Sequence, residues 1–430
     1  MSKRFYIETY GCQMNEYDSE VLSGILQDGG FVPTDSPDIA DMIFLNTCSV
    51  RDHAEQKIHS RLGELYKFKK KRPDMLIGVV GCMAQNLKDK LLKSKPYVNL
   101  ILGPDSYRHI LDHINSADRH IIDTKLSKFE VYDQLYPARE KGINAWISIM
   151  RGCNKFCSYC IVPYTRGRER SRSVESIVEE AKRCIDSGFS EITLLGQNVN
   201  SYNYKEHRFP ELLEALLTIK GLKRLRYTSP HPQDVDNHLI QLHADHSSVL
   251  AKHIHLPLQA GSDKVLRAMN RTYTKQHYLD LAAKIRKAVP GIGLSTDIIV
   301  GFPGESDADF RDTLDVMKKV KFGSAYTFKY SPRPYTKAYK MTDNVPEHIK
   351  SARLTELIEL QKEHTLFRYR ELIGQDVSII VEGESRKNPE EYMGRTSCNK
   401  IVVFPKEKYR PGDIITRHIT DARGITLFSR

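Results

Sequence analysis

The 430-residue sequence contains no hydrophobic run that is long enough to cross a membrane. Its longest apolar stretches, such as Met75–Val80 and Asp297–Phe302, fall far below the roughly 20 residues that a bilayer requires. Lys3 and Arg4 lead directly into an expected strand, which is unlike the start of a signal peptide. We therefore expect a cytoplasmic protein with no membrane partner.

Two nucleotide-binding motifs are also absent. The sequence has neither a P-loop nor a G-x-G-x-x-G turn after a strand, so nucleotide hydrolysis and nicotinamide chemistry have no support. The 16 histidines are scattered, and none has a metal-ligand partner at a suitable spacing. Internal repeats and low-complexity segments are missing too.

The composition is that of a globular protein, with 40% hydrophobic and 28% charged residues. A chain of this length exceeds what one hydrophobic core usually organises, so two or three domains are expected. The net charge of +11 favours a polyanionic partner such as RNA. The charge is clustered at residues 67–72 (KFKKKR) and at Arg166, Arg168, Arg170 and Arg172. The first cluster fits a solvated helix end as well as it fits a contact with RNA.

Strands and helices alternate along most of the chain, which predicts an α/β fold with three domains. Residues 1–118 are typical of a parallel, flavodoxin-like sheet, and residues 116–141 form a polar connection. Residues 139–364 contain six strand–helix units and predict a partial TIM barrel, with its reactive centre at the C-terminal ends of the strands. Residues 365–430 have short alternating strands, which predict a small, OB-like β-barrel.

The expected strands of the first domain are Arg4–Thr9, Met42–Asn46, Leu76–Val80 and Val98–Leu102. Those of the barrel are Ala145–Met150, Glu191–Leu195, Leu222–Tyr227, His253–Leu256, Gly293–Val300 and Gly323–Tyr330.

The most informative motif is residues 151–160 (RGCNKFCSYC), which follow the first barrel strand. Its three thiols, Cys153, Cys157 and Cys160, have the spacing C-x3-C-x2-C. A structural zinc site normally needs four protein ligands, whereas a four-iron cluster held by three thiolates keeps one iron open. Three buried apolar cysteines are a poor alternative, because the loop around them is polar.

This loop resembles the signature of radical S-adenosylmethionine (SAM) enzymes. The resemblance implies that the three cysteines hold a [4Fe-4S] cluster whose open iron binds SAM, and that an electron from the cluster cleaves SAM to a 5′-deoxyadenosyl radical. It also implies that Tyr159 contacts the adenine of SAM. The six strand–helix units resemble the partial barrel of that family.

A second set of thiols is spread along the first domain. Cys12, Cys48 and Cys82 each come just past the C-terminal end of an expected strand. Because these ends share one edge of a parallel sheet, the three loops could bring their thiols into one crevice. One thiol on each loop is modest evidence when each is taken alone.

Residues 8–15 (ETYGCQMN) and 46–51 (NTCSVR) resemble the N-terminal domain of methylthiotransferases, whose three cysteines carry an auxiliary [4Fe-4S] cluster. Residues 394–400 (GRTSCNK) resemble the RNA-binding TRAM domain that ends these proteins. The resemblance therefore covers the whole chain and implies catalytic roles for all six cysteines. Cys184, on an apolar helix stripe with Ile177 and Ala181, and the solitary Cys398 are assigned to neither cluster.

Polar and glycine residues follow the later barrel strands, where they could approach a cofactor. By resemblance, SAM contacts are expected from these positions, although each residue could instead bind only the backbone of the barrel. They are Gln197, Ser229, Gln259, Arg271 and Asp297.

Residues 10–15, 196–202 and 269–274 resemble the branch of the family that modifies isopentenyl-adenosine beside the tRNA anticodon. This implies methylthiolation at C2 of the base, with two SAM molecules serving as methyl donor and radical source. Arg166, Arg168 and Arg395 are the expected RNA contacts, and the tRNA anticodon stem-loop is the expected partner. We further expect a flavodoxin- or ferredoxin-type electron donor and a monomer.

Two alternatives stay open at this point. One is the neighbouring branch, which modifies threonylcarbamoyl-adenosine in tRNA. The other is a non-catalytic RNA-binding iron–sulfur sensor, which would keep the cysteines and the basic barrel but would have no need for SAM.

Overall fold

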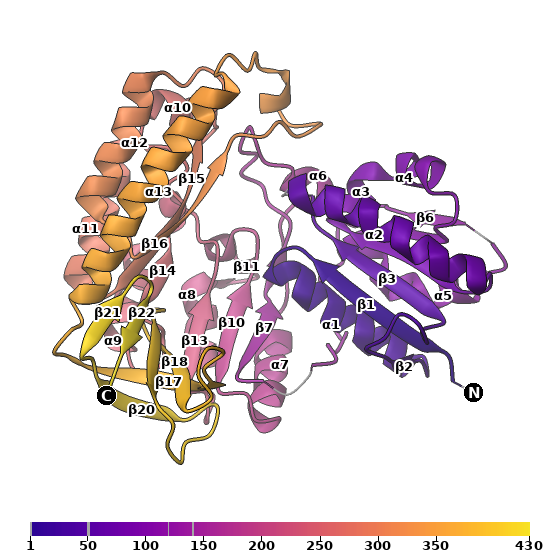
Figure 1. Ribbon diagram of the computed structural model, residues 1–430, viewed down its shortest axis with the longest axis horizontal. Helices are drawn as coiled ribbons and strands as arrows, with labels where there is room; N and C mark the ends of the chain where they lie inside the picture. The colour runs from indigo at the N-terminus through magenta and orange to yellow at the C-terminus, as the bar shows by residue number, and fades with distance from the viewer. Residues whose placement is uncertain (1, 50–51, 119, 140–141) are drawn as a thin grey trace.

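The computed structural model describes residues 2–49, 52–118, 120–139 and 142–430. Val50 and Arg51, which end the second methylthiotransferase-like motif, lie outside the described residues. Figure 1 shows an N-terminal α/β domain, a central open barrel and a small C-terminal β domain. No helix within the described ranges is long and apolar enough to cross a membrane.

The N-terminal domain is built on a parallel sheet with the strand order β2-β1-β3-β4-β5-β6. Its strands are β1 (Arg4–Tyr10), β2 (Val32–Pro33), β3 (Met42–Thr47), β4 (Leu76–Gly81), β5 (Leu100–Leu102) and β6 (Ile121–Asp123). This order continues the flavodoxin-like pattern, in which the chain changes direction between β1 and β3. The parallel, flavodoxin-like prediction is confirmed, while β2 and β6 were not expected.

Helices cover both faces of this sheet. α1 (Gln13–Asp28) packs on one face through Tyr17, Val21 and Leu22, with α5 (Ile110–Asn115) beside it. α2 (Asp52–Lys71) covers the other face through Ile58 and Leu62. The shorter α3 (Cys82–Leu87) and α4 (Asp89–Ser94) join this second face. The loops at the C-terminal edge of the sheet therefore remain available for a site.

The central domain has six parallel strands, in two hydrogen-bonded groups with the orders β13-β10-β7 and β14-β15-β16. The strands are β7 (Asn144–Ser148), β10 (Glu191–Leu195), β13 (Arg224–Tyr227), β14 (His253–His255), β15 (Gly293–Val300) and β16 (Ser324–Lys329). A bridge between Leu225 and Leu250 connects the two groups. The result is the predicted partial barrel, open between β16 and β7.

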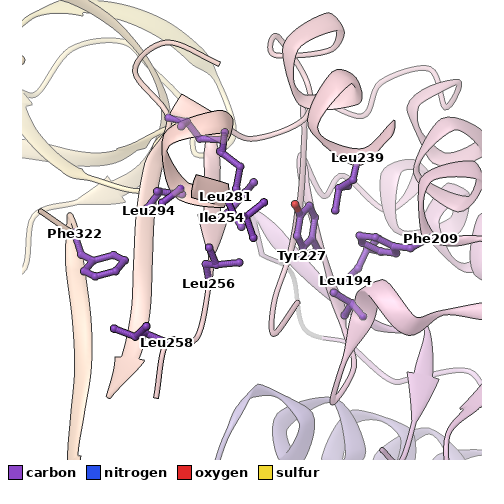
Figure 2. Close-up of a cluster of buried hydrophobic side chains, with 14 of the residues drawn as sticks. Leu194, Phe209, Tyr227, Leu239, Ile254, Leu256, Leu258, Leu281, Leu294 and Phe322 are labelled. Carbon is purple, nitrogen blue, oxygen red and sulfur yellow. The ribbon is translucent and has the colours of Figure 1, made fainter. Parts of the chain in front are cut away.

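Helices pack on the convex side of the barrel. They are α7 (Val174–Asp186), α8 (Phe209–Leu217), α9 (Asn237–Asp245), α10 (Asp263–Ala268), α11 (Lys275–Ala288), α12 (Asp307–Val320) and α13 (Glu347–Arg370). Figure 2 shows the apolar layer that these helices share with the strands, including Leu194, Tyr227 and Leu256. Cys184 of α7 is 3% exposed within this core, which confirms its assignment as a structural residue.

The C-terminal domain is a curled six-stranded sheet with the order β20-β17-β18-β19-β22-β21. Its strands are β17 (Asp376–Glu384), β18 (Glu391–Thr396), β19 (Ile401–Pro405), β20 (Ile414–His418), β21 (Asp421–Arg423) and β22 (Thr426–Phe428). The end of β18 docks on the barrel, where Arg224 and Arg226 of β13 donate to the carbonyls of Arg395 and Thr396 at 2.8 and 2.9 Å. Because Arg224 begins β13, this domain sits at the N-terminal ends of the barrel strands.

The N-terminal domain and the barrel meet across buried ion pairs. Asp105 lies in a 3-10 turn, Pro104–His109, after β5. Its carboxylate pairs with Arg151 of β8 (Met150–Arg151) at 3.1 Å and with Arg170 of β9 (Arg170–Ser171) at 2.8 Å. The guanidinium of Arg151 is fully buried and also lies 3.7 Å from the ring centroid of Tyr132. Tyr132 belongs to the expected connection, which is therefore part of the interface.

Replacing Asp105 with alanine should strongly destabilise this interface, because two buried guanidinium groups would lose their carboxylate. Leaving a buried charge unpaired costs about 3–5 kcal/mol. The measurement is the midpoint of urea unfolding, followed by circular dichroism. Glu179→Ala removes an exposed partner of Arg183 and should leave the midpoint nearly unchanged. Equal midpoints for the two variants would contradict this account of the interface.

Candidate active site

Cys12, Cys48 and Cys82, here called the N-terminal triad, follow β1, β3 and β4. Cys12 caps α1, Cys48 comes directly after β3, and Cys82 begins α3. The three strands are neighbours in the parallel sheet, so these loops share its C-terminal edge at the β1/β3 switch point, where α/β folds bind ligands. Close packing supports the placement, because a Cβ at Gly11 would lie only 2.9 Å from the Cβ of Cys48.

Buried amides fix the loops of the N-terminal triad. Asn15 donates from Nδ2 to Asn46 Oδ1 at 3.0 Å, and Asn46 donates back to the carbonyl of Asn15 at 2.8 Å. The hydroxyl of Thr47 donates to the carbonyl of Val80 at 2.6 Å, which connects the ends of β3 and β4. These amide bonds hold the loops that carry Cys12 and Cys48 in a defined arrangement.

Arg166 of the central domain reaches into the N-terminal triad. Its Nε donates to the Sγ of Cys82 at 3.2 Å, and its Nη2 donates to Asp18 Oδ2 at 2.6 Å. Arg166 is 3% exposed, and its Nη1 is buried with no hydrogen-bond partner among the described residues. A cation in this position suits a group that carries negative charge beside the thiols.

The thiols of the N-terminal triad differ in acidity. The pKa of Cys12 falls to about 6, because the Cys48 side chain hydrogen-bonds to it. The charge of Arg166 also lowers this pKa, whereas burial raises it. Burial raises the pKa of Cys82, although Arg166 acts in the opposite direction. Iron binds the thiolate, so the nearby guanidinium favours the protonation state that a cluster requires.

Cys153, Cys157 and Cys160, here called the barrel triad, lie on the loop after β8. The N–H of Cys153 donates to the carbonyl of Gly167 at 3.1 Å, and that of Cys160 donates to the carbonyl of Cys157 at 2.9 Å. The amide of Asn270 donates to the carbonyls of Lys155 and Phe156, both at 3.0 Å. The loop is thus held from two sides.

Burial dominates the acidity of two of these thiols. It raises the pKa of Cys153 to about 11 and that of Cys160 to about 12. Arg271, which is 8% exposed, donates from Nη1 to the Sγ of Cys157 at 3.4 Å. A metal overrides such raised values, because a coordinating thiol is deprotonated outright.

Neither triad suits a single metal ion. Across the ranges that the structure describes, no three His, Cys, Asp or Glu side chains are close enough to share one ion. A four-iron cluster has a different requirement, because each thiolate binds a separate iron. The N-terminal triad fits this requirement, because a buried guanidinium lies beside its thiols. The barrel triad fits it too, because its three thiols lie on one loop.

The barrel rim has unusual backbone at three successive strand ends. Ser229, after β13, and Gln259, after β14, have φ angles of 58° and 69°. Gly301, after β15, has a φ angle of 72°. Left-handed backbone at non-glycine residues costs free energy and is concentrated at functional sites. This rim is where the sequence predicts contacts with SAM.

The structure connects some of the predicted SAM contacts to the barrel triad and leaves others apart. Gln197 accepts from the N–H of Gly152 at 2.5 Å, and Arg271 reaches Cys157 as described above. Tyr159 packs against the barrel core. Gln259 donates from its backbone N–H to the carbonyl of Asp297 at 2.8 Å. The Asp297 carboxylate instead lies 3.2 Å from Nε2 of His255. Ser229 lies on the same rim as the other predicted contacts.

The arginine cluster of residues 166–172, from which RNA contact was expected, is mostly buried. Arg166 pairs with Asp18, Arg170 with Asp105, and Arg172 with Glu180 at 2.6 Å. Their charges are neutralised within the domain interface and do not reach the surface, which differs from the expectation of phosphate contacts. Arg168 is exposed above the ring of Phe156, 4.2 Å from its centroid. Arg395 is half-buried and donates to Glu382 at 2.7 Å.

Sequence reasoning missed several residues of the site. Asp234 pairs with Lys155 of the cysteine loop at 2.7 Å and accepts from Asn198 at 3.2 Å. His231 is buried against Tyr273, and burial together with the charge of Arg271 lowers its pKa to about 2, so its ring stays neutral. Only the rim position of His231 offered a signal for it.

Gly152 offers a direct test of the loop geometry. It has a φ angle of 76°, and a Cβ there would lie 2.0 Å from the carbonyl oxygen of Arg168. Gly152→Ala should displace Cys153 and reduce the iron that reconstitution loads into the barrel triad. Gly304 has a similar φ of 82° but open space around it, so Gly304→Ala is the matched control and should keep its iron. Equal iron contents would show that the close approach at Gly152 does not position the loop.

Comparison with known families agrees with this division of the chain. Uncharacterized protein family UPF0004 matches residues 4–103, the Radical SAM superfamily matches residues 147–317, and the TRAM domain matches residues 370–430. A radical S-adenosylmethionine methyltransferase from Kitasatospora setae, TsrM, solved with cobalamin and a [4Fe-4S] cluster, is similar with a TM-score of 0.59 at 16% identity. The match covers 79% of this chain and 77% of that one, which supports the fold.

Two curated relatives are both tRNA-2-methylthio-N(6)-dimethylallyladenosine synthases. The protein from Porphyromonas gingivalis is 45% identical, over 99% of this chain and 94% of its own length. The protein from Bacillus pumilus is 44% identical, over 99% of this chain and 85% of its own length. The chain belongs to the family of these tRNA-2-methylthio-N(6)-dimethylallyladenosine synthases, which bind SAM and [4Fe-4S] clusters.

Proposed function

We propose that this protein adds a methylthio group to C2 of dimethylallyladenosine next to the anticodon in tRNA. The observation that carries the proposal is the connection between two cysteine triads by one side chain. Arg166, six residues after Cys160 of the barrel triad, hydrogen-bonds to Cys82 of the N-terminal triad. The two triads therefore lie in one region, on opposite sides of a domain interface. A reaction that needs both clusters requires such proximity.

Each triad holds one [4Fe-4S] cluster, with Cys12, Cys48 and Cys82 at the auxiliary site and Cys153, Cys157 and Cys160 at the radical site. When bound, the clusters and SAM supply the sulfur site, the methyl group and the radical that removes hydrogen from C2. Tyr159, Gln197, Ser229, Gln259, Arg271 and Asp297 hold SAM. The bonds from Gln197 and Arg271 to the cysteine loop support this assignment.

Arg168 and Arg395 contact tRNA phosphate, whereas Arg166 serves as the cation beside the N-terminal triad. The C-terminal domain docks at the opposite end of the barrel strands from the barrel triad. It therefore binds a different part of the tRNA from the part that enters the site. The enzyme is a monomer, and a flavodoxin- or ferredoxin-type protein reduces it.

The two triads should be separable by mutation. Reconstituted enzyme should hold about eight irons, and a Cys153→Ala, Cys157→Ala, Cys160→Ala variant should keep about half of them while losing SAM cleavage. A Cys12→Ala, Cys48→Ala, Cys82→Ala variant should still form 5′-deoxyadenosine but no methylthiolated product. Iron analysis and chromatography of the products provide the readouts.

Cys184→Ala and Cys398→Ala serve as controls and should retain both activities. SAM cleavage by the barrel-triad variant would overturn the radical-site assignment. Methylthiolated product from the folded N-terminal-triad variant would overturn the auxiliary-site assignment.

Turnover should depend on the dimethylallyl group of the base. Burying this apolar tail stabilises the bound base by about 1–3 kcal/mol, and unmodified adenosine lacks the contact. We expect product from tRNA that carries dimethylallyladenosine and little from unmodified tRNA. Mass spectrometry of nucleosides after incubation with SAM and reductant is the measurement. Equal product from threonylcarbamoylated tRNA would move the protein to the neighbouring branch, and absence of SAM cleavage with every tRNA would favour a sensor.

A further inference from the structure

Four exposed aromatic rings lie close together in sequence near the end of the barrel. Tyr326 and Phe328, in β16, are 58% and 40% exposed. Tyr335 and Tyr339, in the loop that follows, are 59% and 54% exposed. We call these four residues the aromatic strip. Scattered exposed apolar residues are ordinary, but several exposed large rings on one short segment are typical of an interaction surface.

The position of β16 explains why the first two rings face outward. β16 is the last strand of its sheet, and its residues alternate between exposed and half-buried. Ala325 and Thr327 line a small cavity with Ile358 of α13. Tyr326 and Phe328 therefore point to the other face of the strand, the concave side of the barrel. There the ring of Tyr326 lies 5.9 Å from that of His255, which neighbours Asp297.

The loop that follows β16 contacts the cysteine loop of the barrel triad and lies near the N-terminal triad. The N–H of Ala338 donates to the carbonyl of Ser158 at 2.7 Å, and Ser158 lies between Cys157 and Cys160. Arg333 lies within electrostatic range of Cys48 in the N-terminal triad. The aromatic strip is thus anchored beside the region that the substrate base must reach.

The charge of this segment is uniformly positive. Residues 324–342 contain four basic residues, Lys329, Arg333, Lys337 and Lys340, and no Asp or Glu. Lys337 and Lys340 are exposed, and within the described part of the chain neither forms an ion pair. Exposed rings interleaved with unpaired lysines are typical of surfaces that bind single-stranded nucleic acid.

We propose that the aromatic strip stacks unpaired bases of the tRNA anticodon loop while Lys337 and Lys340 bind its phosphates. The inference rests on the proposed function and adds the place where the loop is held. Single-stranded RNA is recognised by stacking splayed bases on aromatic rings, and lysines neutralise the backbone beside them. An electron-donating protein is a weaker candidate for this surface, because the rings of β16 face the concave side of the barrel.

The test is binding of a labelled anticodon stem-loop RNA that carries dimethylallyladenosine to the full-length reconstituted protein, measured by fluorescence anisotropy. Tyr335→Ala with Tyr339→Ala should weaken binding on the order of tenfold to a hundredfold, because two stacking rings are lost. Tyr335→Phe with Tyr339→Phe keeps the rings and should retain the affinity. Phe129→Ala removes an exposed ring elsewhere, 86% exposed, and should have no effect.

A blunt RNA duplex without a loop separates stacking from charge. The tyrosine-to-alanine variant should bind this duplex like the wild type. Lys337→Gln with Lys340→Gln should weaken binding of the stem-loop and reduce the slope of log affinity against log salt by about 1–2. Unchanged stem-loop affinity of the alanine variant would overturn the inference. The inference would also fail if the electron donor reduced this variant more slowly than the wild type while RNA binding stayed intact.

Wild-type turnover distinguishes this failure from failure of the proposed function. If the wild type methylthiolates the tRNA and the alanine variant binds the stem-loop equally well, only the aromatic strip is refuted. If the wild type forms no methylthiolated product on any tRNA, the proposed function fails as well.

Discussion

Buried pairing of arginine with carboxylate is the constraint on which the arrangement of the two triads depends. Asp18 of the N-terminal domain pairs with Arg166 of the central domain, and Asp105 pairs with Arg151 and Arg170. Glu180 of α7 adds a third such centre and accepts from Tyr17 of α1 at 3.4 Å. Burying these charges is costly, and they are tolerated only with their partners in place. The domains therefore have one favourable relative position, which sets the separation of the triads.

This arrangement gives Arg166 two roles that the same geometry satisfies. Its Nη2 neutralises Asp18 across the interface, while its Nε faces a sulfur of the N-terminal triad. A shift of the domains would break both bonds together. Precise placement matters for the proposed reaction, since a misplacement of about 1 Å can cost a hundredfold in rate. The interface thus contributes to positioning as well as to stability.

The sequence predicts the fold, and the position of the cysteines at the ends of strands, because these signals are local. Apolar strands end directly before Cys48 and Cys82, and strand–helix alternation reveals the barrel. Other features depend on residues that are distant in the chain. From the sequence, Arg166 is expected to be a surface cation. The structure pairs it with Asp18, which is 148 residues away in the chain. β6 has only three residues, too few for periodicity, and is formed by pairing with β5.

The aromatic strip shows the converse case. Its local pattern indicates burial, but the tertiary structure leaves its rings exposed. Tyr326 and Phe328 alternate along β16 as core residues of a strand do. A closed barrel would cover that strand edge with a further strand, but the barrel here ends at β16. The rings that a closed barrel would bury are consequently available to a ligand. An open barrel edge beside two triads therefore favours stacking of substrate bases over packing of the protein on itself.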